Sequence, residues 1–314
     1  MLRALSVRLL QAVPVVLLVA VLAFLLMHML PGDPAVIIAG PDATPEAVDK
    51  LRHELGLDRP ILQQLVTWIA QLAQGNFGKS LGLNQTVLVA VGERLPVTLS
   101  LAFLSFSITL PVGILLGMLA GYFRNRWIDA AVMGIALLGV SVPGFWIAIL
   151  SVILFSVTLG WVPSSGYLPL SAGVGPWLAS LIQPASVLAL FQVGFLARMT
   201  RSAMLDVLDQ DYIRTARAKG VREWRVVGKH VFRNALMSVV TVSGIILSLL
   251  IGGSVIIEQV FALPGVGRMV VQGIMARDYP LIQGAMLLFG FAFVLVNVTV
   301  DLIYTLVDPR VHYD

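Results

Sequence analysis

The chain is poor in charge and contains no cysteine. Asp, Glu, Lys and Arg make up 12% of its 314 residues, and hydrophobic residues make up 58%. Soluble chains contain about 25% charged residues, so this composition excludes a soluble globular protein. The lack of cysteine excludes disulfides and thiolate metal sites. The histidines have no metal-ligand spacing, and we expect no metal site; they are His28, His53, His230 and His312.

Long runs without charge indicate membrane-spanning helices. No Asp, Glu, Lys or Arg occurs in residues 95–123, 130–197, 234–257 or 279–300. A helix needs about 20 apolar residues to cross the hydrocarbon core, so each run can span it at least once. The apolar stretch 9–30 is longer than the about 7–15 residues of a signal-peptide core, and it predicts a retained first helix.

These runs predict an all-α polytopic membrane protein with about six transmembrane helices. The run 130–197 is too long for one helix, and it divides at 160–176, which is rich in glycine, proline and serine. The predicted spans are 9–30, 96–122, 131–159, 178–199, 234–257 and 281–306. Gly113, Gly117 and Gly121 lie four residues apart, which predicts close packing of the second span against another helix.

The polar segment 31–95 predicts a small helical cap after the first helix. Thr44-Pro45-Glu46 has the pattern of an N-cap, a proline at the first helical position and an acid in the first turn. Gly56 would end that helix, and a second amphipathic helix would follow at 61–72. The predicted domains are therefore the N-terminal helix 1–30, the cap 31–95 and a transmembrane domain 96–314.

The placement of lysine and arginine predicts the orientation. With the N-terminus in the cytoplasm, 14 of the 21 Lys and Arg residues lie inside and 7 outside. This predicts a multi-pass membrane protein with both termini cytoplasmic. The cap would be extracytoplasmic, and the loop 201–233, between the fourth and fifth spans, would be cytoplasmic.

The sequence shows no catalytic signature, so we expect no enzyme activity. Gly78-Lys79-Ser80 resembles the end of a phosphate-binding loop, but Ala73 stands where the first glycine belongs and no strand precedes it. Only two acids, Glu258 and Asp301, come near the spans, each at a span's end. Glu258 could line a pore or cap the fifth helix. The lack of mid-membrane acids argues against an ion-coupled secondary transporter.

The loop 201–233 predicts a short helix, a turn at Gly220 and a second helix, with Trp224 and Val227, that returns to the membrane. One interpretation is a basic loop lying on anionic membrane lipid. The alternative is a short helix, built from small residues, that docks in a groove on a partner.

One segment of this loop resembles a known motif. Arg214-Thr-Ala-Arg-Ala-Lys-Gly220 is similar to the E-A-A-x-x-x-G coupling motif of binding-protein-dependent ABC importer permeases. Arg214 and Thr215 depart from its Glu-Ala, and His230-Val-Phe-Arg233 lacks the following Ile, Leu and Pro. These departures are typical of the dipeptide/oligopeptide/nickel permease branch.

Further segments resemble that branch along nearly the whole chain. They are His28-Met-Leu-Pro-Gly-Asp-Pro34, Leu55-Gly-Leu-Asp-Arg-Pro60, Arg198-Met-Thr-Arg-Ser-Ala-Met-Leu205, Glu258-Gln-Val-Phe-Ala-Leu-Pro-Gly-Val-Gly-Arg268, Arg277-Asp-Tyr-Pro280 and Val307-Asp-Pro-Arg310.

The resemblance implies half of a heterodimeric pore in a bacterial or archaeal cytoplasmic (inner) membrane. A second homologous permease would complete it, two cytoplasmic ATPases would bind the ATP and Mg, and an extracytoplasmic binding protein would deliver substrate. This chain would hold no cofactor and no nucleic acid. Peptides are the expected substrate, with glutathione or nickel complexes as alternatives. The ATPase-coupling residues would be Asp211, Tyr212, Arg214, Thr215, Ala216, Arg217, Ala218, Lys219 and Gly220. Asp33 and Arg59 are candidates for contact with the binding protein.

Overall fold

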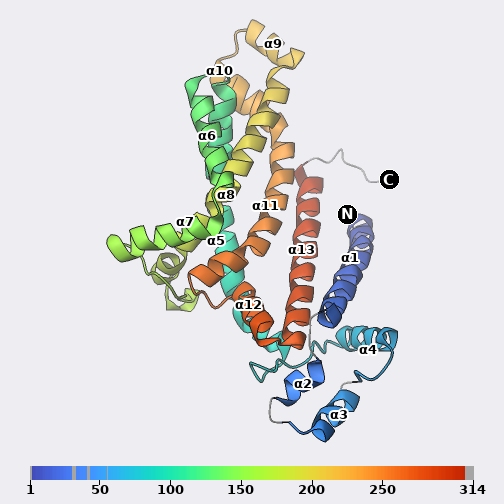
Figure 1. The fold of residues 1–314 in the computed structure, drawn as a ribbon. Helices are drawn as coiled ribbons and strands as arrows, with labels where there is room; N and C mark the ends of the chain where they lie inside the picture. Colours follow the sequence, from blue (N-terminus) through green and yellow to red (C-terminus); the bar gives the residue numbers. More distant parts are fainter. Residues whose placement is uncertain (1, 30–32, 41–42, 55, 308–314) are drawn as a thin grey trace. The chain divides into compact units, whose positions relative to one another are not determined.

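The computed structural model describes residues 2–29, 33–40, 43–54 and 56–307 (Figure 1). Within these ranges the chain is helical, with one isolated β-bridge between Lys79 and Thr86, which confirms the all-α class. The α-helices are α1 (Leu2–Met29), α2 (Pro34–Ala39), α3 (Pro45–Glu54), α4 (Ile61–Ala73), α5 (Val87–Tyr122), α6 (Trp127–Ser141), α7 (Gly144–Ser151), α8 (Val174–Leu208), α9 (Asp211–Ala218), α10 (Glu223–Arg225), α11 (Phe232–Val260), α12 (Val266–Ala276) and α13 (Tyr279–Val307). Parts of the sequence predictions fall outside the described residues. They concern residues 31–32, 55 and 308–314 and the side chain of Asp301.

Four of the described helices are long and apolar enough to cross a membrane. They are Val87–Tyr122, Val174–Leu208, Glu223–Val260 and Tyr279–Val296. A bent helix pair, Trp127–Gly139 with Gly144–Thr158, makes up to five. In α1 the described apolar stretch, Val13–Leu25, is shorter. The polytopic membrane architecture is therefore confirmed, and the count of six spans stays a prediction.

The chain divides into two compact units, each with its own packing. Unit 1 comprises Met1–Pro96 and Arg268–Val294, and unit 2 comprises Val97–Gly267 and Leu295–Asp314. The predicted domain limits at 30/31 and 95/96 stay a prediction.

The cap helices of unit 1 begin and end at the residues that the sequence predicts. The Thr44 hydroxyl accepts a hydrogen bond from Ala47 N at 3.3 Å at the start of α3. Gly56 follows the helix with a φ of +68°, the left-handed conformation that favours glycine. Helix α2 was not predicted. Asp33 caps it, because its carboxylate accepts from Ala35 N at 2.9 Å.

Unit 1 also contains a buried carboxylate, Asp278, at the start of α13. Its Oδ1 accepts from Leu281 N at 3.3 Å and so caps the helix. Its Oδ2 accepts from the Ser80 hydroxyl at 2.5 Å and from Gly82 N at 3.0 Å. Asp278 is 1% exposed. It thereby holds the turn that contains Ser80 against the beginning of α13, which gives Ser80 a structural role.

The glycine stripe of α5 packs against α8 in unit 2, as predicted. A Cβ at Gly113 would lie 2.9 Å from the Leu196 side chain, and one at Gly117 would lie 2.6 Å from the Ala197 carbonyl oxygen. Only glycine allows the two helices to approach this closely.

Helix α5 begins at Val87, so the predicted start at Pro96 was wrong. A proline inside a helix removes one backbone hydrogen bond, and this is why the sequence favours a start at Pro96. Val87 and Val91 are nevertheless buried, and a Cβ at Gly284 of α13 would lie 2.5 Å from Val87. This packing within unit 1 sustains the helix ahead of the proline.

The predicted third span, 131–159, is not one straight helix. It consists of α6, α7 and a π-helical segment, Val152–Thr158, and it is bent by 96° between α6 and α7. Pro143 explains the break, because it disfavours helical dihedrals at the residue before it. Val142 accordingly has an extended conformation, with φ −92° and ψ 132°.

Helix α12 was also not predicted, because the sequence places a loop between the predicted spans 234–257 and 281–306. Gly265 and Gly267 favour a loop. However, Val266, Met269 and Gly273 are all buried and recur at helical spacing. This weak period was the available signal for the helix.

Candidate coupling site

Helix α9 is the short helix predicted in the loop 201–233. Asp211 lies in its first turn, where a carboxylate interacts favourably with the helix dipole. Gly220, with a φ of +73°, follows its last turn. Gly220 N donates to the Arg217 carbonyl at 2.9 Å, and Val221 N donates to the Ala216 carbonyl at 3.2 Å. These two bonds form a Schellman motif, so Gly220 ends the helix and turns the chain as predicted.

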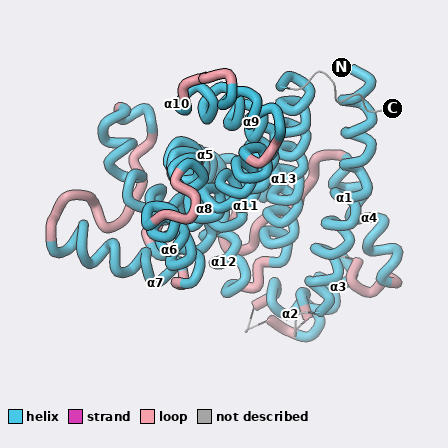
Figure 2. Tube along the Cα trace, turned by 90° about the horizontal axis from the view of Figure 1, so that it is seen from above, coloured by secondary structure: helices cyan, strands magenta, loops and turns pink. Residues whose placement is uncertain are grey.

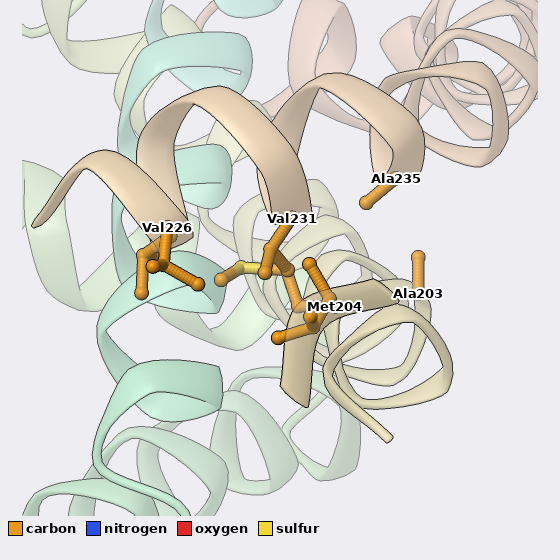
Figure 3. Packing of buried hydrophobic residues seen from close by; sticks show 7 residues of the cluster. Ala203, Met204, Val226, Val231 and Ala235 are labelled. Atoms are coloured by element: carbon orange, nitrogen blue, oxygen red, sulfur yellow. The ribbon is translucent and has the colours of Figure 1, made fainter. Parts of the chain in front are cut away.

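Ile213 anchors α9 to the longer helices of unit 2. Its side chain is 0% exposed, whereas the residues on either side of it are exposed. Ile213 belongs to a buried apolar cluster that joins α8, α9, the π-helical segment Val226–Val231 and the start of α11, shown in Figure 3. The cluster consists of Ala203, Met204, Ile213, Val226, Val227, Val231 and Ala235. A displacement of α9 is therefore opposed by packing against the ends of two long helices.

An ion pair closes the turn around Gly220. Arg217 Nη2 lies 2.7 Å from Glu223 Oε1, and Arg217 Nε lies 3.3 Å from Glu223 Oε2. This hydrogen bonding, followed by the charge of the Glu223 carboxylate, raises the pKa of Arg217. Both side chains are about two-fifths exposed, so the pair contributes little to stability. Its two-point geometry instead fixes the angle between α9 and α10.

The predicted coupling residues form the accessible part of α9 and of the turn after it. Of the nine, Ala216 is half-buried and the others are exposed. Tyr212 is 47% exposed and carries the largest apolar surface among them. Arg214 pairs with Asp211 at 3.3 Å on this exposed face. The helix therefore presents a small polar surface with one aromatic ring, while Ile213 faces the protein.

The turn between α5 and α6 contacts the segment that connects α8 to α9. Arg124, in the turn between α5 and α6, binds both carboxylate oxygens of Asp209 at 3.1 Å. Asp209 follows the last residue of α8, two positions before α9 begins. This contact ties the α5–α6 turn to the segment that leads into α9.

Two residues that position α9 were missing from the sequence prediction. For Ile213 a signal was available, because it is a branched apolar residue in a mainly polar helix, which indicates that this position faces the protein. Glu223 has no comparable signal, because its contact with Arg217 depends on the turn that lies between them.

Glu258, the candidate pore or gate residue, is 0% exposed at the end of α11. Its Oε1 accepts a hydrogen bond from the Thr98 hydroxyl at 2.7 Å. Thr98 Oγ1 in turn accepts from Val266 N at 2.9 Å. A Cβ at Gly265 would collide with the Glu258 carboxylate. The side chain thus joins α5, α11 and the glycine-rich loop within unit 2, and its role at a pore stays a prediction.

The two candidate residues for contact with a binding protein differ in their surroundings. Asp33 Oδ2 pairs with Arg52 Nη2 at 2.5 Å, so its carboxylate links α2 to α3. The hydrogen bond from Arg52 holds the pKa of Asp33 below its ordinary value, against the opposing effect of burial. Arg59 is exposed in the turn between α3 and α4.

Comparison with known families identifies the class of protein. The family described as "Binding-protein-dependent transport system inner membrane component" matches residues 113–313. Its N-terminal counterpart, "Binding-prot-dependent transport system membrane comp, N-term", matches residues 1–102. The chain belongs to this family. It is thus a multi-pass inner-membrane permease component of ABC transport systems, and the resemblance seen in the sequence is confirmed.

Three relatives match over 98% of the permease and at least 97% of their own length. A protein of Brucella suis biovar 1 (strain 1330), named as a permease of a peptide transport system, is 63% identical. A protein of Sinorhizobium fredii (strain NBRC 101917 / NGR234), named as a peptide ABC transporter permease, is 41% identical. The glutathione transport system permease protein GsiC of Escherichia coli (strain K12) is 42% identical.

A solved structure shares the fold of the permease. A chain of the MetNI methionine ABC transporter, in inward-facing conformations, is 25% identical with a TM-score of 0.54. The match covers 71% of the permease and 96% of that chain.

Proposed function

We propose that the permease forms half of the translocation pore of an ATP-driven importer for peptides. A second homologous permease completes the pore, and two cytoplasmic ATPases drive it with ATP and Mg. An extracytoplasmic binding protein delivers the peptide. Family membership and the names of the relatives support this assembly.

The observation that carries the proposal is the construction of α9. Its predicted coupling residues are accessible to an ATPase, while Ile213 packs the helix against α8 and the start of α11, and the Arg217–Glu223 pair holds the turn between α9 and α10. A rigid link of this kind transmits a push on α9 to helices long enough to span the membrane. A basic loop that only rests on lipid requires neither a buried anchor nor a closed turn.

The placement of lysine and arginine supports a cytoplasmic α9 and an extracytoplasmic cap. In this orientation both termini are cytoplasmic. The cap then faces the binding protein, with Arg59 as the better contact residue, because the Asp33 carboxylate is already occupied by Arg52 and Ala35.

The substrate assignment rests on the relatives, because selectivity in such a system lies mainly with the binding protein. Peptide is favoured by two of the three relatives, including the one at 63% identity. Glutathione is the second candidate, and the 42% identity with GsiC favours it.

The test is to co-express the permease with the genes for the second permease and the two ATPases, reconstitute the purified complex in bilayers and measure ATP hydrolysis. We expect hydrolysis to rise when the binding protein and a peptide are added. In Gly220→Asp, whose new side chain occupies the left-handed turn, this response should be lost while the complex stays assembled. Failure of the wild-type permease to co-purify with ATPases would refute the proposal. If ATP hydrolysis rises with glutathione and not with other peptides, glutathione replaces peptides as the proposed substrate.

A further inference from the structure

Helices α6 and α8 run side by side in unit 2 (Figure 2). Two adjoining hollows lie along this helix pair. The larger has a volume of about 600 Å³ and the smaller about 240 Å³. Arg126, Trp127, Asp129, Met133 and Arg201 line the larger one. Met133, Ala136, Leu137, Gly194 and Arg198 line the smaller one. Met133 lines both, so the two hollows meet at this side chain, and together they are called the groove.

The groove follows two antiparallel helices. Asp129 of α6 pairs with Arg201 of α8 at one end. At the other end, a Cβ at Gly194 of α8 would lie 2.8 Å from the Ala136 carbonyl oxygen of α6. Seven residues of α6 separate these two contacts, which corresponds to about 10 Å along the helix axis. The lack of a side chain at Gly194 brings the two backbones together and forms the floor of the groove.

One end of the groove is positively charged. Both Asp129 oxygens accept hydrogen bonds from Arg201, at 2.5 and 2.7 Å, and one also accepts from Asn125 N at 3.0 Å. The carboxylate is therefore covered, with 6% of its side chain exposed. Arg126 is exposed in the same hollow, and Arg198, three residues from Arg201 on α8, is exposed in the smaller hollow. Three arginines against one aspartate give this stretch of the groove an excess of positive charge.

Apart from Arg198, the smaller hollow is apolar. Leu137 is 64% exposed and lies next to Met133 and Ala136. Trp127, 78% exposed, marks the charged end, and tryptophan is enriched where a membrane meets water. In the orientation proposed above, the charged end is at the cytoplasmic surface, because the α5–α6 turn and α9 adjoin it. The apolar end then lies deeper in the bilayer.

We propose that this groove binds an anionic phospholipid of the cytoplasmic leaflet. The phosphate lies between Arg126, Arg198 and Arg201, and an acyl chain follows α6 past Met133 and Leu137. Arg201 Nε and Nη2 are used by Asp129, and its Nη1 has no protein partner among the described residues, so it can donate to a phosphate oxygen. The change from charged to apolar over one groove matches an amphiphile in a bilayer. An apolar surface on the second permease would leave these arginines without a counter-charge.

Arg126→Gln combined with Arg198→Gln tests the headgroup contacts in the intact transporter. Phosphatidylglycerol retained by the purified complex is measured by mass spectrometry after exchange into phosphatidylcholine. We expect a loss of about fivefold in affinity for each arginine removed. Arg225→Gln is the matched control, because Arg225 is also exposed and stacks on an exposed tryptophan, Trp224, but lines neither hollow. Equal losses in the control and the double variant would overturn the proposal.

Leu137→Cys tests the acyl-chain contact. The permease has no native cysteine, so a benzophenone attached to this thiol is the only such label on the chain. In the bilayer-reconstituted complex, light should produce an adduct with the mass of a phospholipid, and addition of Met133→Trp, which fills the groove, should reduce it. A crosslink to the second permease in place of lipid would overturn the proposal and show that the groove is a subunit interface.

Discussion

Replacing Ile213 with alanine is expected to release α9 from the long helices without removing any accessible coupling residue. Truncation of a buried isoleucine to alanine costs about 2–5 kcal/mol, depending on how far the site collapses. The Ile213 side chain is 0% exposed, but α9 lies at the edge of its cluster and can settle inward. We therefore expect the lower part of that range, about 2–3 kcal/mol.

The assay is amide hydrogen exchange across residues 211–220 in the assembled transporter, together with ATP hydrolysis. A loss of about 2–3 kcal/mol from local opening accelerates exchange about 30- to 160-fold. Exchange in the middle of α8 should not change. Stimulation of ATP hydrolysis by the binding protein should fall, because motion of the ATPases would then move α9 without moving α8 and α11.

Tyr212→Ala is the matched control, because Tyr212 is adjacent but 47% exposed. In Tyr212→Ala the free energy of local opening that governs exchange should stay within about 0.5 kcal/mol of the wild type. The same substitution removes the main apolar contact that α9 offers to an ATPase. Unchanged exchange in Ile213→Ala would refute the reasoning that this side chain anchors α9. Accelerated exchange with normal stimulation would refute the coupling role of the anchor.

Three further predictions concern stability and pH. Gly117→Ala places a Cβ 2.5 Å from the Thr200 Cβ, so it should lower the free energy of unfolding of the purified permease by about 1–3 kcal/mol, measured by thermal unfolding. Gly134→Ala is the control, because it has open space around it and should leave this free energy unchanged. Asp278→Ala removes the cap of α13 and leaves two donors without an acceptor, so it should cost about 2 kcal/mol or more, measured by thermal unfolding. The folded-state pKa of Asp33 is lowered by Arg52, so this pair stabilises the cap above the ordinary carboxyl pKa of 3.8 and is lost as pH falls through the lowered folded value. Proteolysis between α2 and α3 should therefore increase at acidic pH in the wild type and show no such pH dependence in Asp33→Asn.

The long helices and α9 could be predicted because their signals are local. Charge-free runs locate α5, α8, α11 and α13, and Gly220 fixes the end of α9 by its own backbone preference. The errors arise where packing overrides such local signals. Pro96 indicates a helix start, yet burial of Val87 and Val91 extends α5 ahead of it. Conversely, Pro143 breaks the predicted span 131–159, and because that span is apolar throughout, its hydrophobicity does not predict the break.

The contacts that build the sites were less predictable, because they join residues far apart in the chain. Asp278 reaches Ser80 across 198 positions, and Asp129 reaches Arg201 across 72. The sequence identifies the coupling segment by its motif, but it does not show which side of α9 is anchored. That side follows from the burial of Ile213 together with the Arg217–Glu223 pair.

Glu258 and the short loop that leads from α11 into α12 at Val266 form one structural feature. A Cβ at Gly265 would collide with the Glu258 carboxylate, and one at Gly267 would lie 2.7 Å from Val255 Cα and 3.0 Å from Glu258 Oε2, so the two glycines allow the loop to close over the carboxylate. Thr98 then connects this loop to α5, because its hydroxyl donates to Glu258 and accepts from Val266. The end of α11 is thereby bound to α5, while its beginning contacts α9 through the cluster around Ile213. Motion transmitted from α9 along α11 must either carry this part of α5 with it or break the Thr98–Glu258 hydrogen bond.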